Sequence, residues 1–231
     1  MVIKQVRSLD EISKNFNDWY VSEVYGSSIS GWFLRKSHYF VEESFKCRSG
    51  LDNLLEVGCG PVGHLENVRH KYDHYAYCDL SYKSVKSSIS NVFNSQKGVN
   101  VPFGFSADCR TLPVRTGSFD RLIACHVLEH VFDPEAAIWE WHRVVRPGGF
   151  ISILLPCDPG IAWRLGRALG VRNRFKEFPY DYYMAKQHVN SIFNLQNIIY
   201  HICDSYSEFY YPFNALPSPD LNLFWCVHIK T

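Results

Sequence analysis

The sequence lacks a long hydrophobic run and any signal for export. Its longest apolar stretches are short, such as Phe150 to Pro156, whereas a transmembrane helix needs about 20 consecutive apolar residues. The segment from Met1 to Phe16 is polar and of mixed charge, which is unlike a signal peptide. We therefore expect no membrane span and a cytoplasmic location.

An excess of one charge is also absent. The 231 residues include 24 Lys and Arg against 23 Asp and Glu, which gives a formal net charge of +1. Nucleic-acid binding depends on neutralising phosphates, so the balance predicts no nucleic-acid partner, although it allows a local basic patch. The eight cysteines form no CxxC pair. Their spacing disfavours a structural zinc site of thiolates and fits reduced, intracellular thiols.

Apolar and aromatic residues are plentiful. Hydrophobic residues make up 46% of the chain and charged residues 20%, which is typical of a folded domain with a substantial core. The aromatic residues comprise 6 Trp, 14 Tyr and 16 Phe. They are enough to supply a core, a substrate pocket, or both.

Short apolar runs alternate with helix-like segments through the middle of the chain. Strands separated by helices predict parallel βαβ units and a doubly wound α/β sheet. Ser81 and Asp133 are expected to cap helices, and Pro134 suits a first helical turn. The expected strands cover residues 54–59, 74–79, 101–108, 119–126 and 150–155, and the expected helices cover residues 62–71, 81–94 and 133–145.

The last third of the chain breaks this alternation. Residues 158–189 contain no clear strand, and we interpret them as an inserted helical lid that carries a basic stretch. A helix is expected over residues 190–203, followed by strands over 208–213 and 223–230. The nine residues between these strands are too few for a crossover helix, so the two strands are expected to be antiparallel.

A glycine-rich loop follows the first strand. The stretch Glu56-Val-Gly-Cys-Gly-Pro-Val-Gly63 fits the pattern GxGxxG, which is typical of a dinucleotide site when it lies between a strand and a helix. Asp79 ends the next strand, where a carboxylate can accept hydrogen bonds from ribose hydroxyls. Glu56 would repel a pyrophosphate but not a sulfonium ligand with an amino group. The loop therefore favours S-adenosylmethionine over a nicotinamide dinucleotide.

Four segments together resemble the class I S-adenosylmethionine-dependent methyltransferases, and most closely their type 11 small-molecule group. They are LLEVGCGPVGHL (54–65), YCDLS (77–81), FSADCRTLPVRTGSFDRLIACHVLEHV (105–131) and RVVRPGGFISILLP (143–156). The resemblance implies a Rossmann-like, doubly wound sheet of seven strands, mostly parallel with an antiparallel C-terminal strand. It also implies a single methyltransferase domain over residues 1–231. Its parts are an N-terminal helical cap (1–50), a cofactor-binding core (51–157), the lid (158–189), and a C-terminal helix with two strands (190–231).

The resemblance also assigns residues to the cofactor, S-adenosylmethionine. Gly58, Gly60 and Gly63 would let the loop backbone approach its methionine part, with Cys59 packed within the loop. Glu56 would lie near its amino group, directly or through water. The other residues implied are Asp79 for the ribose, Leu80 and Asp108 for the adenine, the backbone of Cys109 beside it, and Tyr20 from the N-terminal segment.

The segment from His126 to His130 reads HVLEH. The letters H-x-x-E-H also occur in inverted zinc proteases, but that motif needs a helix and a third ligand, so a protease is disfavoured. In a methyltransferase His126, Glu129 and His130 would face the acceptor, and a histidine there would act as general base. Metal binding and a structural role are the alternatives, and no metal is assigned.

The basic lid indicates a class of acceptor. Arginine binds carboxylate and phosphate in a forked geometry, so Arg164 and Arg167, together with Tyr183 and His188, are expected to bind the acceptor. We expect methyl transfer to oxygen or nitrogen of a small molecule or glycan, such as an anionic sugar unit in polysaccharide biosynthesis. A solvated helix face is the alternative for the basic stretch. A non-catalytic cofactor-binding or partner protein is the alternative for the chain, and no oligomeric state is predicted.

Overall fold

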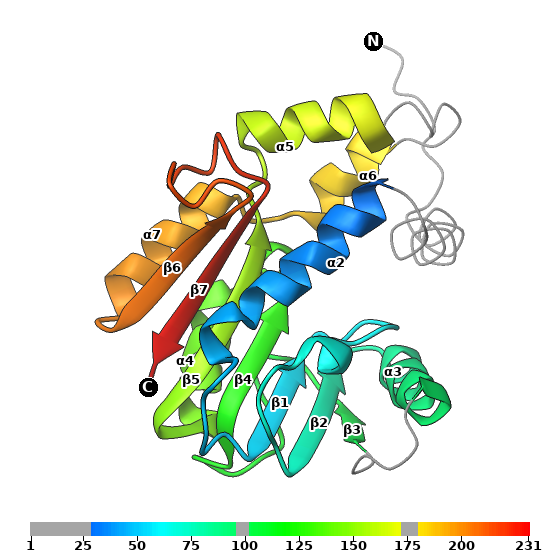
Figure 1. The fold of residues 1–231 in the computed structure, drawn as a ribbon, viewed down its shortest axis with the longest axis vertical. Coiled ribbons are helices and arrows are strands. Elements are labelled where there is room, and N and C mark those ends of the chain that lie inside the picture. The colour runs from blue at the N-terminus through cyan, green and yellow to red at the C-terminus, as the bar shows by residue number, and fades with distance from the viewer. Residues whose placement is uncertain (1–28, 96–101, 172–179) are drawn as a thin grey trace.

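The computed structural model describes residues 29–95, 102–171 and 180–231 (Figure 1). Within them, a seven-stranded sheet has the order β3-β2-β1-β4-β5-β7-β6. Strands β1 to β5 are parallel, whereas β7 is antiparallel to both β5 and β6. The predicted mostly parallel sheet with an antiparallel C-terminal strand is confirmed. The strands are β1 (Asn53–Val57), β2 (His74–Asp79), β3 (Phe103–Ser106), β4 (Phe119–Cys125), β5 (Val145–Pro156), β6 (Tyr206–Tyr211) and β7 (Phe224–Lys230).

Helices cover both faces of this sheet, so it is doubly wound as predicted. Side chains alternate along a strand, and in β4 Leu122 and Ala124 join one apolar cluster while Ile123 joins the other. Figure 1 shows α2 crossing in front of the central strands, with α4 behind them and α7 behind β6. The front face is covered by α2 (Ile29–Val41) and α3 (Tyr82–Ser95), and the back face by α4 (Pro134–Val144) and α7 (Ile192–Ile202).

The predicted starts of two helices are confirmed by their caps. The Asp133 side chain accepts a hydrogen bond from the backbone N–H of Ala136, and Pro134 occupies the first turn of α4. Helix α3 begins directly after Ser81, whose hydroxyl accepts from the backbone N–H of Ser84 at 3.4 Å. Each cap satisfies a backbone donor that the first helical turn leaves free.

The helix predicted over residues 62–71 is wrong. Only a short 3-10 helix, η2 (Leu65–Asn67), forms there. The backbone N–H of His64 donates to Glu56 Oε2 at 2.9 Å, and the backbone N–H of Arg69 donates to Oε2 of the buried Glu42 at 3.3 Å. An α-helix over residues 62–71 would bond the Arg69 N–H to the carbonyl four residues earlier, but Glu42 accepts it instead, and Val68 has a non-helical ψ of 131°. The chain therefore passes from the glycine loop to β2 without an α-helix.

The predicted lid (158–189) is helical over residues 161–171 and 180–187. It lies at the upper end of the sheet in Figure 1. Three basic residues of the predicted lid, Arg172, Arg174 and Lys176, lie outside the described residues, as does Tyr20. The lid elements are α5 (Ile161–Gly166), the π-helical η4 (Arg167–Val171) and α6 (Tyr180–Gln187).

Two further facts bear on the class of protein. None of the helices in the described part of the chain is long and apolar enough to cross a membrane. All eight cysteines fall within that part, and each is a free thiol. The fold is therefore held by its two apolar clusters and its hydrogen bonds.

Candidate active site

The glycine loop is fixed to the end of the neighbouring strand. The backbone N–H groups of Gly58 and Cys59 both donate to the carbonyl of Cys78, at 2.8 and 3.2 Å. Gly58 has φ +68°, and a Cβ there would lie 2.4 Å from Cγ2 of Val127. Only glycine combines this conformation with this close approach. The loop thus lies tightly over the carboxyl ends of β1 and β2, where α/β sheets bind ligands.

Asp79 connects the glycine loop to the turn before α3. Its Oδ2 accepts from the backbone N–H of Gly60 at 2.9 Å, and its Oδ1 accepts from that of Ser81 at 2.7 Å. A carboxylate oxygen has two acceptor positions, so each oxygen keeps capacity for a ligand hydroxyl. Leu80 follows it with 78% of its surface exposed. The oriented Asp79 carboxylate thus lies next to the exposed apolar side chain of Leu80.

Glu56 lies beneath the loop. It is 2% exposed, and its Oε2 accepts from the backbone N–H of His64 at 2.9 Å and from the Tyr75 hydroxyl at 2.6 Å. Burial raises the pKa of Glu56 to about 7, although His64 and the Tyr75 hydrogen bond act in the opposite direction. These internal partners make Glu56 a residue that shapes the loop. The sequence did not indicate its pairing with Tyr75.

Asp108 and Cys109 are already engaged with other side chains. The Asp108 carboxylate accepts from the Arg110 guanidinium, with Nη2 to Oδ2 at 2.6 Å, and this hydrogen bonding lowers the pKa of Asp108 to about 2. The Cys109 carbonyl accepts from Trp141 Nε1 at 3.0 Å. An adenine amine would therefore share the Asp108 carboxylate with Arg110.

His126 follows β4 in a rare backbone conformation. Its φ is +60°, a value that few residues other than glycine adopt. Its backbone N–H donates to the Leu154 carbonyl at 2.8 Å, which fixes it to the end of β5. The ring lies 5.5 Å from that of Phe224, centroid to centroid, and Nδ1 is 3.7 Å from Glu129 Oε1. The strand end thus presents His126 beside a buried carboxylate.

Glu129 is the centre of a cluster of imidazoles. Its side chain is 4% exposed, and its Oε1 lies 4.0 Å from His130 Nε2. Burial raises the pKa of Glu129, but His126, His130 and His188 lower it by more, so it stays below its ordinary value. The Glu129 backbone carbonyl accepts from the N–H of Val189 at 2.8 Å. Val189, at the end of the predicted lid, is thus joined to this cluster.

Two histidines of this cluster have one nitrogen fixed by a hydrogen bond. His130 Nδ1 lies 2.8 Å from the Gln187 carbonyl oxygen, and His188 Nδ1 lies 2.8 Å from Asp158 Oδ2. Because both partners are acceptors, each Nδ1 carries a proton and each neutral ring keeps a lone pair on Nε2. The ring centroids are 5.1 Å apart. Two bases therefore sit side by side, one of them oriented by a carboxylate.

Sequence reasoning missed Asp158, although its position is informative. It lies two residues after β5, at the carboxyl end of a parallel strand. Besides His188 it also binds Arg167, whose Nη1 lies 3.2 Å from Oδ2. Of the other residues expected to bind the acceptor, Arg164 is exposed on α5 and Tyr183 is buried on α6. The two arginines therefore do not form a free basic pair.

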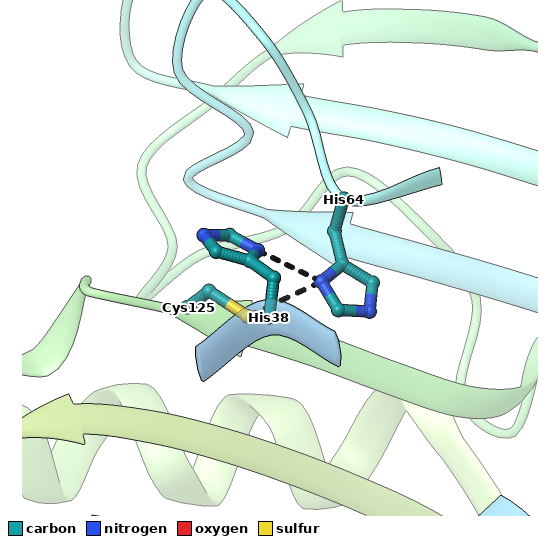
Figure 2. Close-up of side chains that lie close together, drawn as sticks. All are labelled: His38, His64 and Cys125. Carbon is teal, nitrogen blue, oxygen red and sulfur yellow. Dashed lines mark hydrogen bonds between the residues drawn. The ribbon is translucent and has the colours of Figure 1, made fainter. Parts of the chain in front are cut away.

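Two groups of side chains in the described residues have the composition of a metal site. In each group the ligand atoms lie within 4.8 Å of one another. The first group lies in the Glu129 cluster and consists of Glu129, His130 and His188. The second group is buried beneath the glycine loop and consists of His38, His64 and Cys125 (Figure 2).

Comparison with known proteins identifies this arrangement. Residues 55–153 match the profile of a family described as a methyltransferase domain (Methyltransf_11). Ajmaline N-methyltransferase of Rauvolfia serpentina is 34% identical over 104 residues, which are 44% of this chain and 35% of that protein. Ubiquinone biosynthesis O-methyltransferase of Chromobacterium violaceum is 29% identical over 98 residues, 42% of this chain and 41% of that protein. The chain thus spans less than half the length of these relatives.

Solved structures extend the likeness in fold to nearly the whole chain. Phosphoethanolamine N-methyltransferase 2 of Haemonchus contortus aligns with 97% of this chain and 61% of its own, with a TM-score of 0.63 and 13% identity. A protein of Methanococcus maripaludis aligns with 100% of this chain and 98% of its own, also with a TM-score of 0.63 and 13% identity. At this identity the likeness shows the fold.

The order of the strands and the glycine loop are thus those of the class I methyltransferase fold. More narrowly, residues 55–153 match the methyltransferase-domain family model (Methyltransf_11). The resemblance predicted from the four sequence segments is confirmed.

Proposed function

We propose that this chain is an S-adenosylmethionine-dependent methyltransferase that acts on oxygen or nitrogen of a small molecule. The observation that carries the proposal is the set of groups gathered at the carboxyl ends of the parallel strands. There the glycine loop and Asp79, at the ends of β1 and β2, adjoin the Glu129 cluster at the ends of β4 and β5. A candidate cofactor site and a set of bases therefore lie together at the carboxyl ends of the strands, where such sheets bind their substrates.

The cofactor end of this site suits an adenosine with a positively charged tail. Asp79 would accept from the ribose hydroxyls, and the loop from Gly58 to Gly63 would hold the methionine part with its backbone. A pyrophosphate would meet the Asp79 carboxylate without a cationic side chain from the loop. The cofactor supplies an activated methyl group, so the protein mainly has to align the acceptor with it.

The acceptor end suits a hydroxyl or amine that has to lose a proton. The Nε2 lone pairs of His130 and His188 can take that proton, and Glu129 and Asp158 stabilise the imidazolium that results. His126 contacts Glu129 from the other side and orients it. The negative charge of these carboxylates favours a neutral or cationic acceptor at the cluster itself. The named relatives that methylate nitrogen or oxygen of small molecules support this class.

A narrower proposal is an anionic sugar unit of a glycan. It rests on Arg164, which is exposed on α5, because Arg167 is paired with Asp158. If the acceptor is anionic, Arg164→Ala raises its KM while cofactor binding stays constant, and added salt has the same effect. Kinetics that do not depend on salt would instead place a neutral acceptor in the site.

Calorimetry of cofactor binding tests the proposed function. The wild type is expected to bind S-adenosylmethionine and S-adenosylhomocysteine but not NAD. Asp79→Asn should raise the Kd for both ligands tenfold or more, because charge-assisted hydrogen bonds contribute about 1.5–3 kcal/mol each. Glu135→Gln, an exposed change on α4, is the control. Tight binding of NAD with no binding of S-adenosylmethionine would overturn the proposal.

A second experiment distinguishes an enzyme from a non-catalytic binder. A metabolite extract is incubated with the protein and a cofactor that carries a trideuteromethyl group, and products are detected by mass spectrometry. A labelled product that depends on the protein identifies the acceptor. Cofactor binding without any labelled product would favour a binding or partner protein with the same fold.

A further inference from the structure

Three metal-ligating side chains from distant parts of the chain meet beneath the glycine loop. His38 comes from α2, His64 directly follows the loop, and Cys125 is the last residue of β4 (Figure 2). His38 Nδ1 lies 2.9 Å from His64 Nδ1, which in turn lies 3.7 Å from Cys125 Sγ. All three residues are buried. The Nδ1 atoms of the two imidazoles thus face each other beside the Cys125 sulfur.

The far side of His64 decides which of its nitrogens is free. His64 Nε2 lies 3.0 Å from Glu42 Oε1. The Glu42 carboxylate accepts two further hydrogen bonds from the Arg121 guanidinium, at 2.8 and 3.0 Å. A carboxylate held in this way is an acceptor, so His64 donates from Nε2 and keeps the lone pair on Nδ1. A carboxylate behind a histidine is also the usual arrangement behind metal-binding imidazoles.

Two groups, the His38 ring and the Cys125 thiol, compete for the single lone pair of His64 Nδ1. That nitrogen offers one acceptor position in the ring plane, yet both the His38 ring and the Cys125 thiol are directed at it. His38 Nε2 has no hydrogen-bond partner among the described residues. A cation between the three atoms would use the His64 lone pair, the His38 Nδ1 lone pair and the sulfur together.

The spacing is close to that of a metal site. Zinc binds histidine nitrogen at about 2.0–2.1 Å and cysteine sulfur at about 2.3 Å. Tetrahedral angles then separate two nitrogens by about 3.4 Å, and a nitrogen and a sulfur by about 3.6 Å. The observed 3.7 Å between His64 and Cys125 fits. The 2.9 Å between His38 and His64 requires a shift of about half an ångström.

We propose that His38, His64 and Cys125 bind a soft or borderline d¹⁰ cation, Zn²⁺ or Cu⁺, that ties α2 to the glycine loop and β4. Thiolate and imidazole ligands select cations of this kind. On binding, the Cys125 thiol releases one proton to solvent while its sulfur forms a bond to the metal, and no electron is transferred. The proton of His38 resides on Nε2 in the bound form.

The charge of the cluster separates the two candidate ions. Glu42 is already neutralised by Arg121, so the three ligands contribute one negative charge, that of the thiolate. Cu⁺ would give a neutral three-coordinate site. Zn²⁺ would leave one positive charge in a buried place and would need a fourth ligand. The experiment therefore uses both ions.

Cobalt substitution and metal titration test the site. Chelator-treated protein is titrated with Co²⁺, Zn²⁺ and, without oxygen, Cu⁺. The wild type should bind one equivalent of at least Zn²⁺ or Cu⁺, and Co²⁺ should give a thiolate-to-cobalt charge-transfer band. Cys125→Ser should abolish the band. Glu42→Gln, behind His64, should weaken binding about 10–100-fold.

The chain offers a matched control. Cys226 is also buried and has its sulfur 3.7 Å from His228 Nε2. Among the described residues, however, it belongs to neither of the two groups that have the composition of a metal site. Cys226→Ser should keep both the stoichiometry and the band, with circular dichroism showing that each variant is folded. Absence of stoichiometric binding of every ion, or binding unchanged in Cys125→Ser, would overturn the proposal. These readouts involve no methyl transfer, so they fail or succeed independently of the proposed function.

Discussion

At the scale of single residues, the hydrogen bond on one imidazole nitrogen determines what the other nitrogen can do. His188 donates to Asp158 and keeps a lone pair on Nε2. If it acts as the base, His188→Gln should lower kcat about 100-fold while the Kd for S-adenosylhomocysteine changes little. The measurement is steady-state kinetics together with calorimetry.

His130 offers the same test, since its Nδ1 is bonded to the Gln187 carbonyl. His142→Gln, an exposed change on α4, serves as the control for both variants. Full kcat in both His130→Gln and His188→Gln would remove proton transfer from the role of this cluster and leave it as a binding surface.

Glu42 gives a residue-scale prediction on stability. It is fully buried between Arg121 and His64, so Glu42→Ala would leave the Arg121 guanidinium buried without its carboxylate. We expect a loss of about 3–5 kcal/mol in the free energy of unfolding, measured by urea denaturation. The adjacent Glu43→Ala removes an exposed pair with Lys46 and should have no measurable effect. Equal stability of the two variants would contradict this role for Glu42.

At the scale of elements, the glycine loop joins conformation to packing. Gly50 and Gly58 both have positive φ, but a Cβ at Gly50 meets open space, whereas one at Gly58 meets Val127 at 2.4 Å. Gly50→Ala should cost about 1–2 kcal/mol for its backbone conformation alone. Gly58→Ala should cost clearly more and should also weaken cofactor binding. Urea denaturation and calorimetry compare the two, and equal costs would show that the Val127 contact relaxes freely.

Asp120 links three strands at the opposite end of the sheet. Its Oδ2 accepts from the backbone N–H of Asn53 at 2.7 Å, and its Oδ1 accepts from the Arg146 guanidinium. Partial burial raises the pKa of Asp120, but the Arg146 and Asn53 hydrogen bonds lower it by more. Because the folded pKa lies below the unfolded value of about 3.9, its stabilisation is complete above that pH and is lost as pH falls through the folded pKa.

The corresponding prediction concerns stability against pH. Wild type should exceed Asp120→Asn in unfolding free energy at neutral pH, and the difference should shrink as the pH falls below about 4. Asp204→Asn, an exposed change, controls for general charge effects. A difference that stays constant down to the acid limit would show that the ionised carboxylate is not what stabilises this edge.

At the scale of the whole molecule, a ligand that binds only the folded chain raises its melting temperature. S-adenosylhomocysteine at 100 times its Kd contributes about 2.7 kcal/mol. For a chain of 231 residues this corresponds to a rise of about 5–10 °C. Differential scanning fluorimetry measures the shift, which should be smaller in Asp79→Asn. A rise with NAD and none with S-adenosylhomocysteine would contradict the proposed ligand.

The parts of the molecule that sequence reasoning predicted depend on neighbours along the chain. Alternating strands and helices, the glycine loop and the Asp133 cap are all local patterns. The helix predicted over residues 62–71 does not form, in part because Glu42, 27 positions away, accepts from the Arg69 N–H. A one-dimensional pattern cannot show which distant carboxylate will replace a helical carbonyl.

The buried polar network was beyond prediction for the same reason. Arg121 binds Glu42 across 79 positions of sequence, and His188 binds Asp158 across 30. One signal was present, because Arg121 lies in a strand that is apolar apart from Asp120, and a buried guanidinium needs an acidic partner. The sequence does not say which acid that partner is, since α2 had no predicted register against the sheet.

The place of β7 has a consequence for how the chain matures on the ribosome. Strand β6 leaves the ribosome first, but its partner in the sheet is β7, which also closes the free edge of β5. Until residues 224–230 emerge, the nascent chain carries an open strand edge on β5 and an unpaired β6, and such edges invite aggregation. Synthesis therefore passes through an interval in which a chaperone can cover these open edges, and that interval ends when β7 emerges and pairs with β5 and β6.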